Sequence, residues 1–233
     1  MPRRRVKIIV SCEHAGHRVP PKYRPLFRGH ARVLTSHRGW DPGALELARA
    51  IAFASNAPLV ANTASRLLVE CNRSLGHAQL FSEFTRDLDT AEHLRLLATI
   101  YHPHRRAVEV AVRSALRRNA WVVHVGVHTF TPVWNGKRRN VDVGILYDPS
   151  RRFEGFVAEA LVRRLRAEVP KLRVGRNAPY RGWTDGLTTT LRGRFPATRY
   201  AGIEIEVNHG LLRKPDAWKQ VRRALATVVG TLD

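Results

Sequence analysis

The sequence predicts an α/β protein: a single domain over residues 1–233 with a mixed, mostly parallel sheet and helices on both faces. Several short segments are continuous apolar runs, as is typical of strands buried on both faces. They alternate along the chain with longer segments whose apolar residues recur every three or four positions, as in helices. The 233 residues, 44% of them hydrophobic, suffice for one full core, and no repeat or linker divides them.

The first half of the chain opens with a strand and continues into a helix. VKIIVSC, Val6–Cys12, is an apolar run bounded by polar residues. After a proline-rich loop, apolar residues at helical spacing predict a helix over Asp41–Asn56, with Asp41 as the N-cap and Pro42 as the first helical residue. Two short strands or extended segments are expected next, at Pro58–Thr63 and Arg66–Asn72.

The second half continues the alternation. A long helical pattern runs from Asp89 to Arg118, with an interruption at Tyr101–His104 (YHPH). The stretch VVHVGVHTFTP, Val122–Pro132, begins as a buried strand and reaches His128 at its polar end. The remaining expected elements are a strand at Asp142–Asp148, a helix from Phe153 to Val169, a loop to about Thr198, a strand at Ala201–Val207 and a helix from Asp216 to Leu232.

The chain is strongly basic, with a formal net charge of +21, which is compatible with binding to nucleic acid or to anionic surfaces. However, the basic clusters are spread over the whole chain, and only six of the 40 basic residues are lysine, which argues against a dedicated binding face. These clusters are Arg3–Arg5, Arg105–Arg106, Arg117–Arg118, Lys137–Arg139, Arg151–Arg152, Arg163–Arg164 and Arg222–Arg223. The sequence also lacks zinc-finger spacing and the pattern of common RNA binders, so no specific nucleic acid is expected as a partner.

Neither a membrane nor an export signal is expected. No apolar run approaches the roughly 18 to 20 residues that span a bilayer. The apolar stretch near the N-terminus is shorter than the roughly 7 to 15 residues of a signal peptide, so the expected location is the cytoplasm. The two cysteines, Cys12 and Cys71, are too few for a disulfide framework or a thiolate metal cage, and we expect both to be buried free thiols.

Polar side chains collect at the ends of the predicted strands. The first strand runs into Glu13 and His14, and the central strand runs into His128. The last strand carries Glu204 and Glu206, which share one face because strand side chains alternate. Ligands of open α/β sheets bind outside the carboxyl ends of the strands. Histidines and carboxylates converging there suit a catalytic zinc or another divalent ion, held by three protein ligands with a position left for water.

Several of these residues also have a purely structural interpretation. His128 alone would be a hydrogen-bonded histidine at a strand end, and His124, on the same strand face, is better explained as a core or supporting residue. Asp41 is accounted for as an N-cap, which leaves Glu13 as the rival carboxylate ligand. A purely structural interpretation is less suited to Glu204 and Glu206 on the last strand, because ionised carboxylates in a core are costly unless they are paired or bind a metal.

ECNRS, Glu70–Ser74, indicates a second kind of chemistry. The planar guanidinium of Arg73 matches a substrate carboxylate, and Asn72 beside it can donate and accept hydrogen bonds. The alternative is a turn residue followed by a surface arginine.

Eight motifs occur in the order found in the N-formylglutamate amidohydrolase family, and the chain resembles that family from about Val6 to Leu212. The motifs are SCEHAG, RGWDPGA, ECNRS, YHPHRRAVE, VHTFTP, VDVGILYD, NAPYRGWTDG and IEIEVN. The family is similar in fold to the zinc carboxypeptidases and to the aspartoacylase and succinylglutamate desuccinylase group. The resemblance therefore implies a zinc site of two histidines and a carboxylate, an Asn-Arg pair for the substrate carboxylate, and a glutamate base on a late strand.

Carried over position by position, the resemblance implies a role for each candidate residue. The zinc ligands would be His14, Asp41 and His128, and the substrate carboxylate would bind Asn72 and Arg73. The base would be Glu206, with Glu204 as the substitute. Tyr101 and His104 would lie near the substrate. Two positions depart from the family. Glu13 stands where relatives often have proline, and Glu70 stands where better-known members have aspartate.

The implied activity is hydrolysis of the amide of a small N-acylated amino acid, of the N-formyl type, with a free carboxylate. One zinc ion, or another divalent metal, would activate the water. Two other interpretations are a metal-free amidase, with Cys12 as nucleophile and His14 as base, and a basic nucleic-acid-binding protein.

Overall fold

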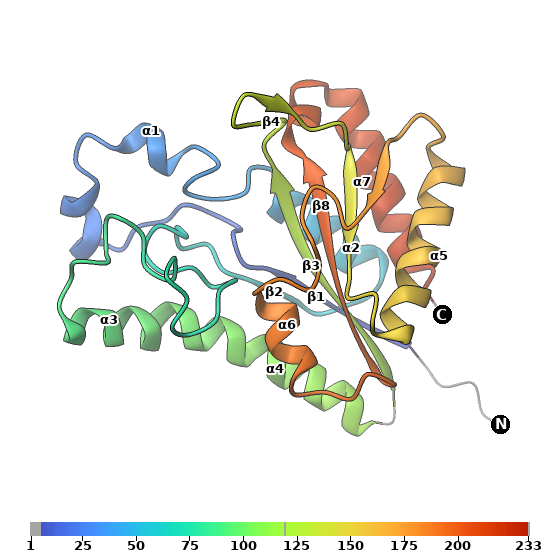
Figure 1. Cartoon of the computed structure of the whole chain (residues 1–233), viewed down its shortest axis with the longest axis horizontal. Helices are drawn as coiled ribbons and strands as arrows, with labels where there is room; N and C mark the ends of the chain where they lie inside the picture. Colours follow the sequence, from blue (N-terminus) through green and yellow to red (C-terminus); the bar gives the residue numbers. More distant parts are fainter. Residues whose placement is uncertain (1–5, 119, 233) are drawn as a thin grey trace.

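A six-stranded sheet organises the chain, in the order β2-β1-β3-β8-β6-β7 (Figure 1). The structure, a computed structural model, describes residues 6–118 and 120–232, and the basic cluster Arg3–Arg5 lies outside them. The strands are β1 (Val6–Cys12), β2 (Leu59–Ala61), β3 (Trp121–Phe130), β6 (Val143–Leu146), β7 (Val174–Arg176) and β8 (Tyr200–Asn208). Every neighbouring pair is parallel except β6 and β8. The sheet is therefore mixed and mostly parallel, as predicted.

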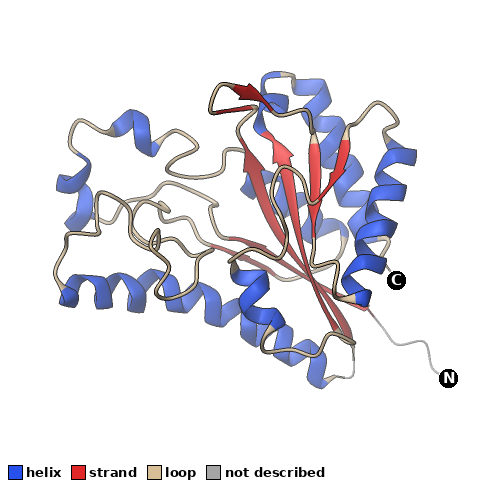
Figure 2. Ribbon diagram, viewed as in Figure 1, coloured by secondary structure: helices blue, strands red, loops and turns tan. Residues whose placement is uncertain are grey.

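Helices cover both faces of this sheet, which confirms the predicted layers. Figure 2 shows them as two groups on either side of the strands. One face packs against α2 (Ala44–Ala54), α5 (Arg152–Glu168) and α7 (Pro215–Gly230), and the other packs against α4 (His102–Arg117) and α6 (Leu187–Arg192).

The central strands contribute side chains to the apolar clusters on both faces of the sheet, because successive side chains point in opposite directions. Val10 and Val125 belong to the apolar cluster formed with α2, α5 and α7, whereas Ile9 and Val122 belong to the cluster formed with α4 and α6. Burial on both faces explains why these strands are continuous apolar runs in the sequence.

Shorter elements lie beside the sheet, near the carboxyl ends of its strands. They are the turns η1 (Pro21–Phe27), η2 (Leu97–Tyr101) and η3 (His209–Arg213), the helices α1 (Ala31–Leu34) and α3 (Thr90–Leu96), and a hairpin of β4 (Val133–Trp134) and β5 (Lys137–Arg138). A separate apolar cluster that includes Tyr23, Phe27, Leu68 and Tyr101 holds the segments at the left of Figure 1 together.

Asp41 is not the N-cap that the sequence predicts. The helix begins at Ala44, and its N-cap is Gly43, whose φ of 83° is accessible at little cost only to glycine. The Asp41 side chain instead faces two histidines, and its backbone N–H donates to the carbonyl of His14. The local pattern was misleading because a cap and a site carboxylate look alike in sequence.

Arg66–Asn72 is also wrong as a strand. The segment is a series of turns, with the Leu68 N–H bonded to the carbonyl of Ser65 and the Arg73 N–H bonded to that of Glu70. The polar side chains of Arg66 and Glu70 face the site described below. The apolar side chains of Leu67, Leu68 and Val69 pack in the separate cluster and take part in no β-pairing.

Three further details differ from expectation. The interruption at Tyr101–His104 is no break, because a π turn, η2, joins α3 to α4, and Pro103 lies in the first turn of α4, where a missing N–H is best tolerated. The predicted loop before Thr198 contains β7 and α6, and the hairpin β4–β5 was also missed. All of these elements are too short to give a periodic signal.

Among the residues that the structure describes, no helix is both long and apolar enough to cross a membrane.

Candidate metal centre and active site

The polar strand ends predicted from the sequence meet at one place. β1 leads into Glu13 and His14, β3 carries His128, and β8 carries Glu206, which is the register partner of His128 in the parallel pair β3–β8. His14, His128 and Glu206 line a cleft of about 690 Å³, in the range typical of small-molecule sites. The cleft opens at the carboxyl ends of the parallel strands, where ligands of such sheets bind.

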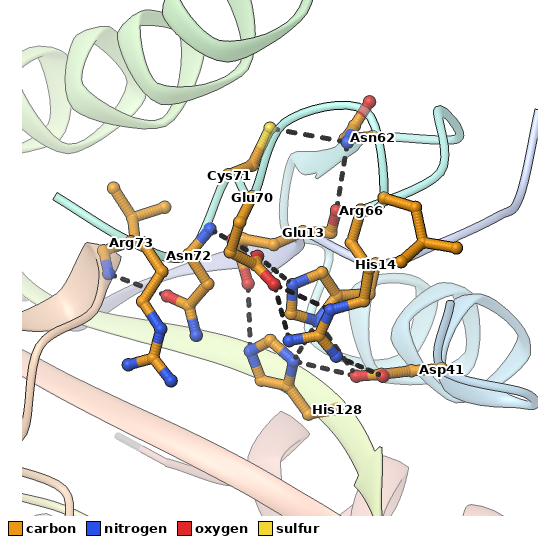
Figure 3. Close-up of polar contacts among 12 residues, drawn as sticks. Glu13, His14, Asp41, Asn62, Arg66, Glu70, Cys71, Asn72, Arg73 and His128 are labelled. Carbon is orange, nitrogen blue, oxygen red and sulfur yellow. Dashed lines mark hydrogen bonds and ion pairs between the residues drawn. The ribbon is translucent and has the colours of Figure 1, made fainter. Parts of the chain in front are cut away.

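Three side chains form what we call the donor triangle: Nδ1 of His14, Nδ1 of His128 and Oδ2 of Asp41. The two nitrogens are 3.2 Å apart, and the carboxylate oxygen lies 3.2 Å from His14 Nδ1 and 3.0 Å from His128 Nδ1. All three residues are buried, and the imidazole centroids are 5.0 Å apart. Figure 3 shows the three side chains converging from separate parts of the chain. The group could therefore hold a metal ion.

The dimensions of the donor triangle fit a tetrahedral divalent ion. Bonds of about 2.0–2.1 Å to zinc at tetrahedral angles place ligand atoms about 3.3 Å apart. The observed sides of 3.0 to 3.2 Å are close to this value. Two imidazoles and one carboxylate also form a donor set that zinc favours, and all three residues line the cleft.

The outer nitrogen of His14 is fixed by Glu70, whose Oε1 contacts His14 Nε2. Glu70 is itself bonded by Arg66, whose Nε lies 2.7 Å from Oε2, and by the backbone N–H of Asn72, 3.0 Å from Oε1. Because an ionised carboxylate only accepts hydrogen bonds, His14 carries a proton on Nε2, and Nδ1 is the nitrogen left to face a cation.

The outer nitrogen of His128 faces Glu13, at 3.1 Å between Nε2 and Oε2, although the N–H is not aimed straight at the oxygen. The other oxygen of Glu13 lies 3.2 Å from Nε2 of His104. Of the two rival carboxylates, Asp41 therefore lies inside the donor triangle, and Glu13 lies on the far side of the His128 ring.

The electrostatics of the site favour positive charge at the two inner nitrogens. Burial lowers the pKa of His128, but the hydrogen bonds that its ring donates to Asp41 and Glu13 outweigh burial and hold that pKa well above its ordinary value. Burial and the charge of Arg66 lower the pKa of His14. The charges of Glu70 and Asp41 outweigh them, so the pKa of His14 lies above its ordinary value. Two neutral imidazoles would point lone pairs at each other and at a carboxylate oxygen, so the donor triangle needs either protons or a cation.

Asp41 is held ionised by these same neighbours. Burial alone would raise its pKa, but His14, His128 and Arg66 together keep the pKa well below the usual range of an aspartate. Arg66 Nη1 lies 3.3 Å from Oδ1, the oxygen that takes no part in the donor triangle. One oxygen thus serves the arginine and the other remains directed at the imidazole nitrogens.

Glu206 and Glu204 share one face of β8 but differ in their surroundings. Both line the cleft. Glu204 Oε1 accepts a hydrogen bond from the hydroxyl of Thr188 at 3.1 Å. Oε2 of Glu206 is buried without a hydrogen-bond partner among the described residues, and burial raises the pKa of Glu206 to about 8. A free carboxyl oxygen with a raised pKa beside a cation site is what a proton acceptor requires.

Asn72 and Arg73 lie where a substrate carboxylate could reach them. Both line the cleft. Arg73 donates from Nη1 to the carbonyl of Asp185 at 2.9 Å, and it has no carboxylate within ion-pair distance in the described part of the chain. Asn72 accepts from the N–H of Leu187 through Oδ1, at 2.7 Å, which leaves its amide N–H groups to the cleft. A partly free guanidinium beside an amide donor is suited to binding a carboxylate.

His104 and Tyr101 lie elsewhere than expected. His104 is buried against Glu13 and is not among the residues that line the cleft. Tyr101 donates from its hydroxyl to the carbonyl of Arg73 at 2.8 Å, so it supports the segment that carries Arg73. Neither of them is among the residues that line the cleft.

Sequence reasoning missed three participants: Arg66, Glu70 in its contact with His14, and His37. His37 lines the cleft, with Nε2 bonded to the carbonyl of Thr129 and 3.6 Å from Asp41 Oδ1. The only available signal was sequence spacing, since His37 precedes Asp41 by four residues in a motif that carries a ligand.

The structure disfavours a thiol nucleophile. Cys12 and Cys71 are both buried free thiols, as predicted. Burial, reinforced by the charges of Glu13 and Asp41, holds the pKa of Cys12 well above that of an ordinary thiol. Cys12 is also absent from the residues that line the cleft. A nucleophilic cysteine needs a lowered pKa and access to substrate, and Cys12 has neither.

Comparison with known structures finds the same fold in proteins of other sequence. A gene product of Agrobacterium tumefaciens matches with a TM-score of 0.82 and 32% identity, over 96% of this chain and 89% of that one. An N-formylglutamate amidohydrolase of Ralstonia eutropha matches with a TM-score of 0.74 and 20% identity, over 98% of this chain and 93% of that one. A search of curated proteins finds no significant match.

Comparison with protein families agrees with the sequence motifs. Residues 6–213 match the model of the N-formylglutamate amidohydrolase family, a span that contains β1, the donor triangle, the Asn72–Arg73 pair and Glu206. The chain therefore belongs to the N-formylglutamate amidohydrolase family.

Proposed function

We propose that this protein is a zinc-dependent amidohydrolase that cleaves the amide bond of a small N-acylated amino acid, of the N-formyl type, with a free carboxylate. The observation that carries the proposal is the donor triangle of His14, Asp41 and His128, with sides of 3.0 to 3.2 Å, beside the unpartnered carboxyl oxygen of Glu206. Membership in the N-formylglutamate amidohydrolase family supports the reaction type.

His14, Asp41 and His128 would hold the ion. When bound, zinc supplies a water of lowered pKa, polarises the amide carbonyl and lowers the pKa of the adjacent Glu206. The three residues leave one side of the donor triangle open to the cleft, where substrate and water enter.

Glu206 would act as general base and then as general acid. Its free oxygen accepts a proton from the attacking water as the new C–O bond forms at the amide carbon. It then returns that proton to the amide nitrogen as the C–N bond breaks. The products are the carboxylic acid of the acyl group and the free amino acid. Glu204, bonded to Thr188, is less suited to this role because one of its oxygens is already engaged.

Arg73 and Asn72 would orient the substrate by its carboxylate. The N–H groups of Arg73 that do not contact Asp185, together with the amide of Asn72, lie on the cleft. Binding the carboxylate there fixes the amide against the catalytic groups and makes the reaction effectively intramolecular.

The experiment that tests this proposal is metal analysis coupled to a substrate screen. Purified protein is assayed for bound metal before and after chelation, and for release of amine from N-formylglutamate and from other N-formyl and N-acyl amino acids. We expect about one zinc per chain, loss of activity on chelation and recovery on adding zinc. Activity that survives complete removal of metal would refute the metal-dependent mechanism.

A further inference from the structure

Glu13 is a buried carboxylate with an unusual set of partners. It is 1% exposed, and its ion pairs in the described part of the chain are to histidines alone. Oε1 lies 3.2 Å from Nε2 of His104, and Oε2 lies 3.1 Å from Nε2 of His128. An ionised carboxylate at such a depth is costly unless something compensates it, so its place between the two rings calls for an explanation.

The corresponding carboxylate of the other ligand histidine is held quite differently. Glu70, behind His14, is bonded by the guanidinium of Arg66 and by the backbone N–H of Asn72. These partners fix Glu70 independently of any histidine. In the described part of the chain, the Glu13 carboxylate has neither an arginine nor a backbone N–H partner, and its orientation depends on the two imidazoles it touches.

Among the described residues, the side chain of His104 has one polar contact, which is with Glu13. The residue lies in the first turn of α4, directly after the π turn η2. It is 6% exposed, does not line the cleft, and its Nδ1 has no hydrogen-bond partner among the described residues. A carboxylate accepts, so Nε2 of His104 must donate to Glu13. No other contact in the structure accounts for a buried imidazole at this position.

We infer that Glu13 and His104 are positioning residues of the metal centre: His104 holds the Glu13 carboxylate, and Glu13 holds His128 with Nδ1 directed at the donor triangle. This inference rests on the proposed function, because it concerns the same cation site. Nε2 of His128 lies within ion-pair distance of Glu13, although its N–H is not aimed straight at the carboxylate oxygen. A carboxylate behind a ligand histidine fixes its tautomer and increases its basicity, and losing such a partner typically weakens metal binding about 10- to 100-fold.

The chain offers a matched control in His124. It is buried on the same face of β3, but it is bonded to the hydroxyls of Ser11 and Tyr200 and does not contact Glu13 or the donor triangle. Replacing His124 removes a buried imidazole and its hydrogen bonds without touching the proposed chain from His104 to His128.

The test measures zinc affinity of the folded protein by competition with a chromophoric chelator, for wild type, Glu13→Leu, Glu13→Gln, His104→Leu and His124→Leu. Folding of each variant is checked by circular dichroism. We expect an affinity loss of about 10- to 100-fold for Glu13→Leu, a loss of about 10-fold for His104→Leu, and less than about threefold for His124→Leu. The visible spectrum of the cobalt-substituted protein should shift in the first two variants and remain unchanged in His124→Leu.

Glu13→Gln supplies a rescue that a merely structural role would not give. Its amide oxygen can still accept from His128, while its NH₂ can donate to His104, which is able to move its own proton to the unpartnered Nδ1. We expect its zinc affinity to lie between those of wild type and Glu13→Leu. If Glu13→Leu does not fold, Glu13→Gln and His104→Leu decide the question.

Zinc affinities within about threefold of wild type in both the Glu13 and His104 variants would overturn the inference and leave the proposed function intact. An equal loss in His104→Leu and His124→Leu would also overturn it, since the effect would then come from core damage. A wild-type protein that binds no zinc would refute the metal-dependent function and this inference together.

Discussion

His124 and His128 lie on the same face of β3, one in the middle of the sheet and one at its carboxyl edge, and both are buried. His124 is bonded to two neutral hydroxyls, those of Ser11 and Tyr200, and burial lowers its pKa to about 4. His128 is buried as well, but its contacts with Asp41 and Glu13 hold its pKa well above the ordinary value.

The partners of a buried histidine, more than its burial, therefore decide what it can do. Desolvation disfavours the charged imidazolium in both places. In the middle of the sheet only the charge of Glu13 opposes it, and desolvation outweighs that charge, so the ring remains neutral and serves as a hydrogen-bonding part of the core. At the edge, two carboxylates oppose it and attract positive charge to the ring. A divalent ion is attracted by the same field.

The largest expected effect is the loss of metal on removing the edge histidine. His128→Ala should weaken zinc binding by more than about 1,000-fold, well beyond the roughly 10- to 100-fold typical of a supporting partner, and should abolish turnover. His124→Ala, on the same strand face, should keep the zinc affinity of the folded protein. Chelator competition and activity assays measure both. Equal losses of zinc affinity in the two variants would contradict the different roles given to His124 and His128.

The next effect concerns the carboxylate beside His128 on β8. Glu206→Gln should lower kcat about 1,000-fold while bound zinc is retained, because a general base contributes on the order of 10² to 10⁴ in rate. Glu204→Gln is the matched control on the same strand face, and it should cost much less. Turnover and metal content are measured together. Near wild-type activity in Glu206→Gln would show that the base is assigned to the wrong residue.

A third effect concerns the neutral imidazole of His124, and it is seen in how the stability of the protein depends on pH. Unfolded chains take up the His124 proton near pH 6.5, whereas the folded protein takes it up only near pH 4. This contribution to stability is therefore complete above pH 6.5 and is lost as the pH falls toward 4, by about 3 kcal/mol. His124→Gln has no proton to take up at this position.

The free energy of unfolding should accordingly fall about 3 kcal/mol more in wild type than in His124→Gln between pH 7 and pH 4. Urea titration of chelator-treated protein measures it at each pH. Parallel pH profiles for the two proteins would contradict the lowered pKa of His124.

The smallest expected effect lies farther from the metal. Arg73→Ala should raise KM for carboxylate-bearing substrates by about 10- to 100-fold with a smaller change in kcat, since a charge-assisted hydrogen bond is worth about 1.5–3 kcal/mol. Substrate analogues in which the carboxylate is replaced by an amide should lose little in the variant. Steady-state kinetics with both kinds of substrate separate the two cases, and an unchanged KM for the acid would refute the carboxylate role.

The sequence predicts the sheet and its polar edge well for a physical reason. Strands buried on both faces must be continuous apolar runs, and β1 has the bounds that its run predicts. In such folds the ends of parallel strands meet, so the convergence of His14, His128 and Glu206 could be expected before their distances were known. Short elements such as β7 and α6 carry no comparable signal.

The sequence could not show how the ligand histidines are supported. Which nitrogen of His14 faces Asp41 depends on Glu70, and that contact depends on turns that resemble a strand in sequence. Glu13 was a rival ligand to Asp41 because both are carboxylates near a histidine. Only the ring orientation of His128, a property of the folded chain, places one of them in the donor triangle and the other behind the ring.

The most direct test of the central claim is an anomalous-scattering map at the zinc absorption edge from crystals of the zinc-loaded protein. We predict one peak about 2.0–2.2 Å from Nδ1 of His14, Nδ1 of His128 and a carboxylate oxygen of Asp41. Density for a metal elsewhere, bonds through the Nε2 atoms, or no peak at the donor triangle would contradict the account.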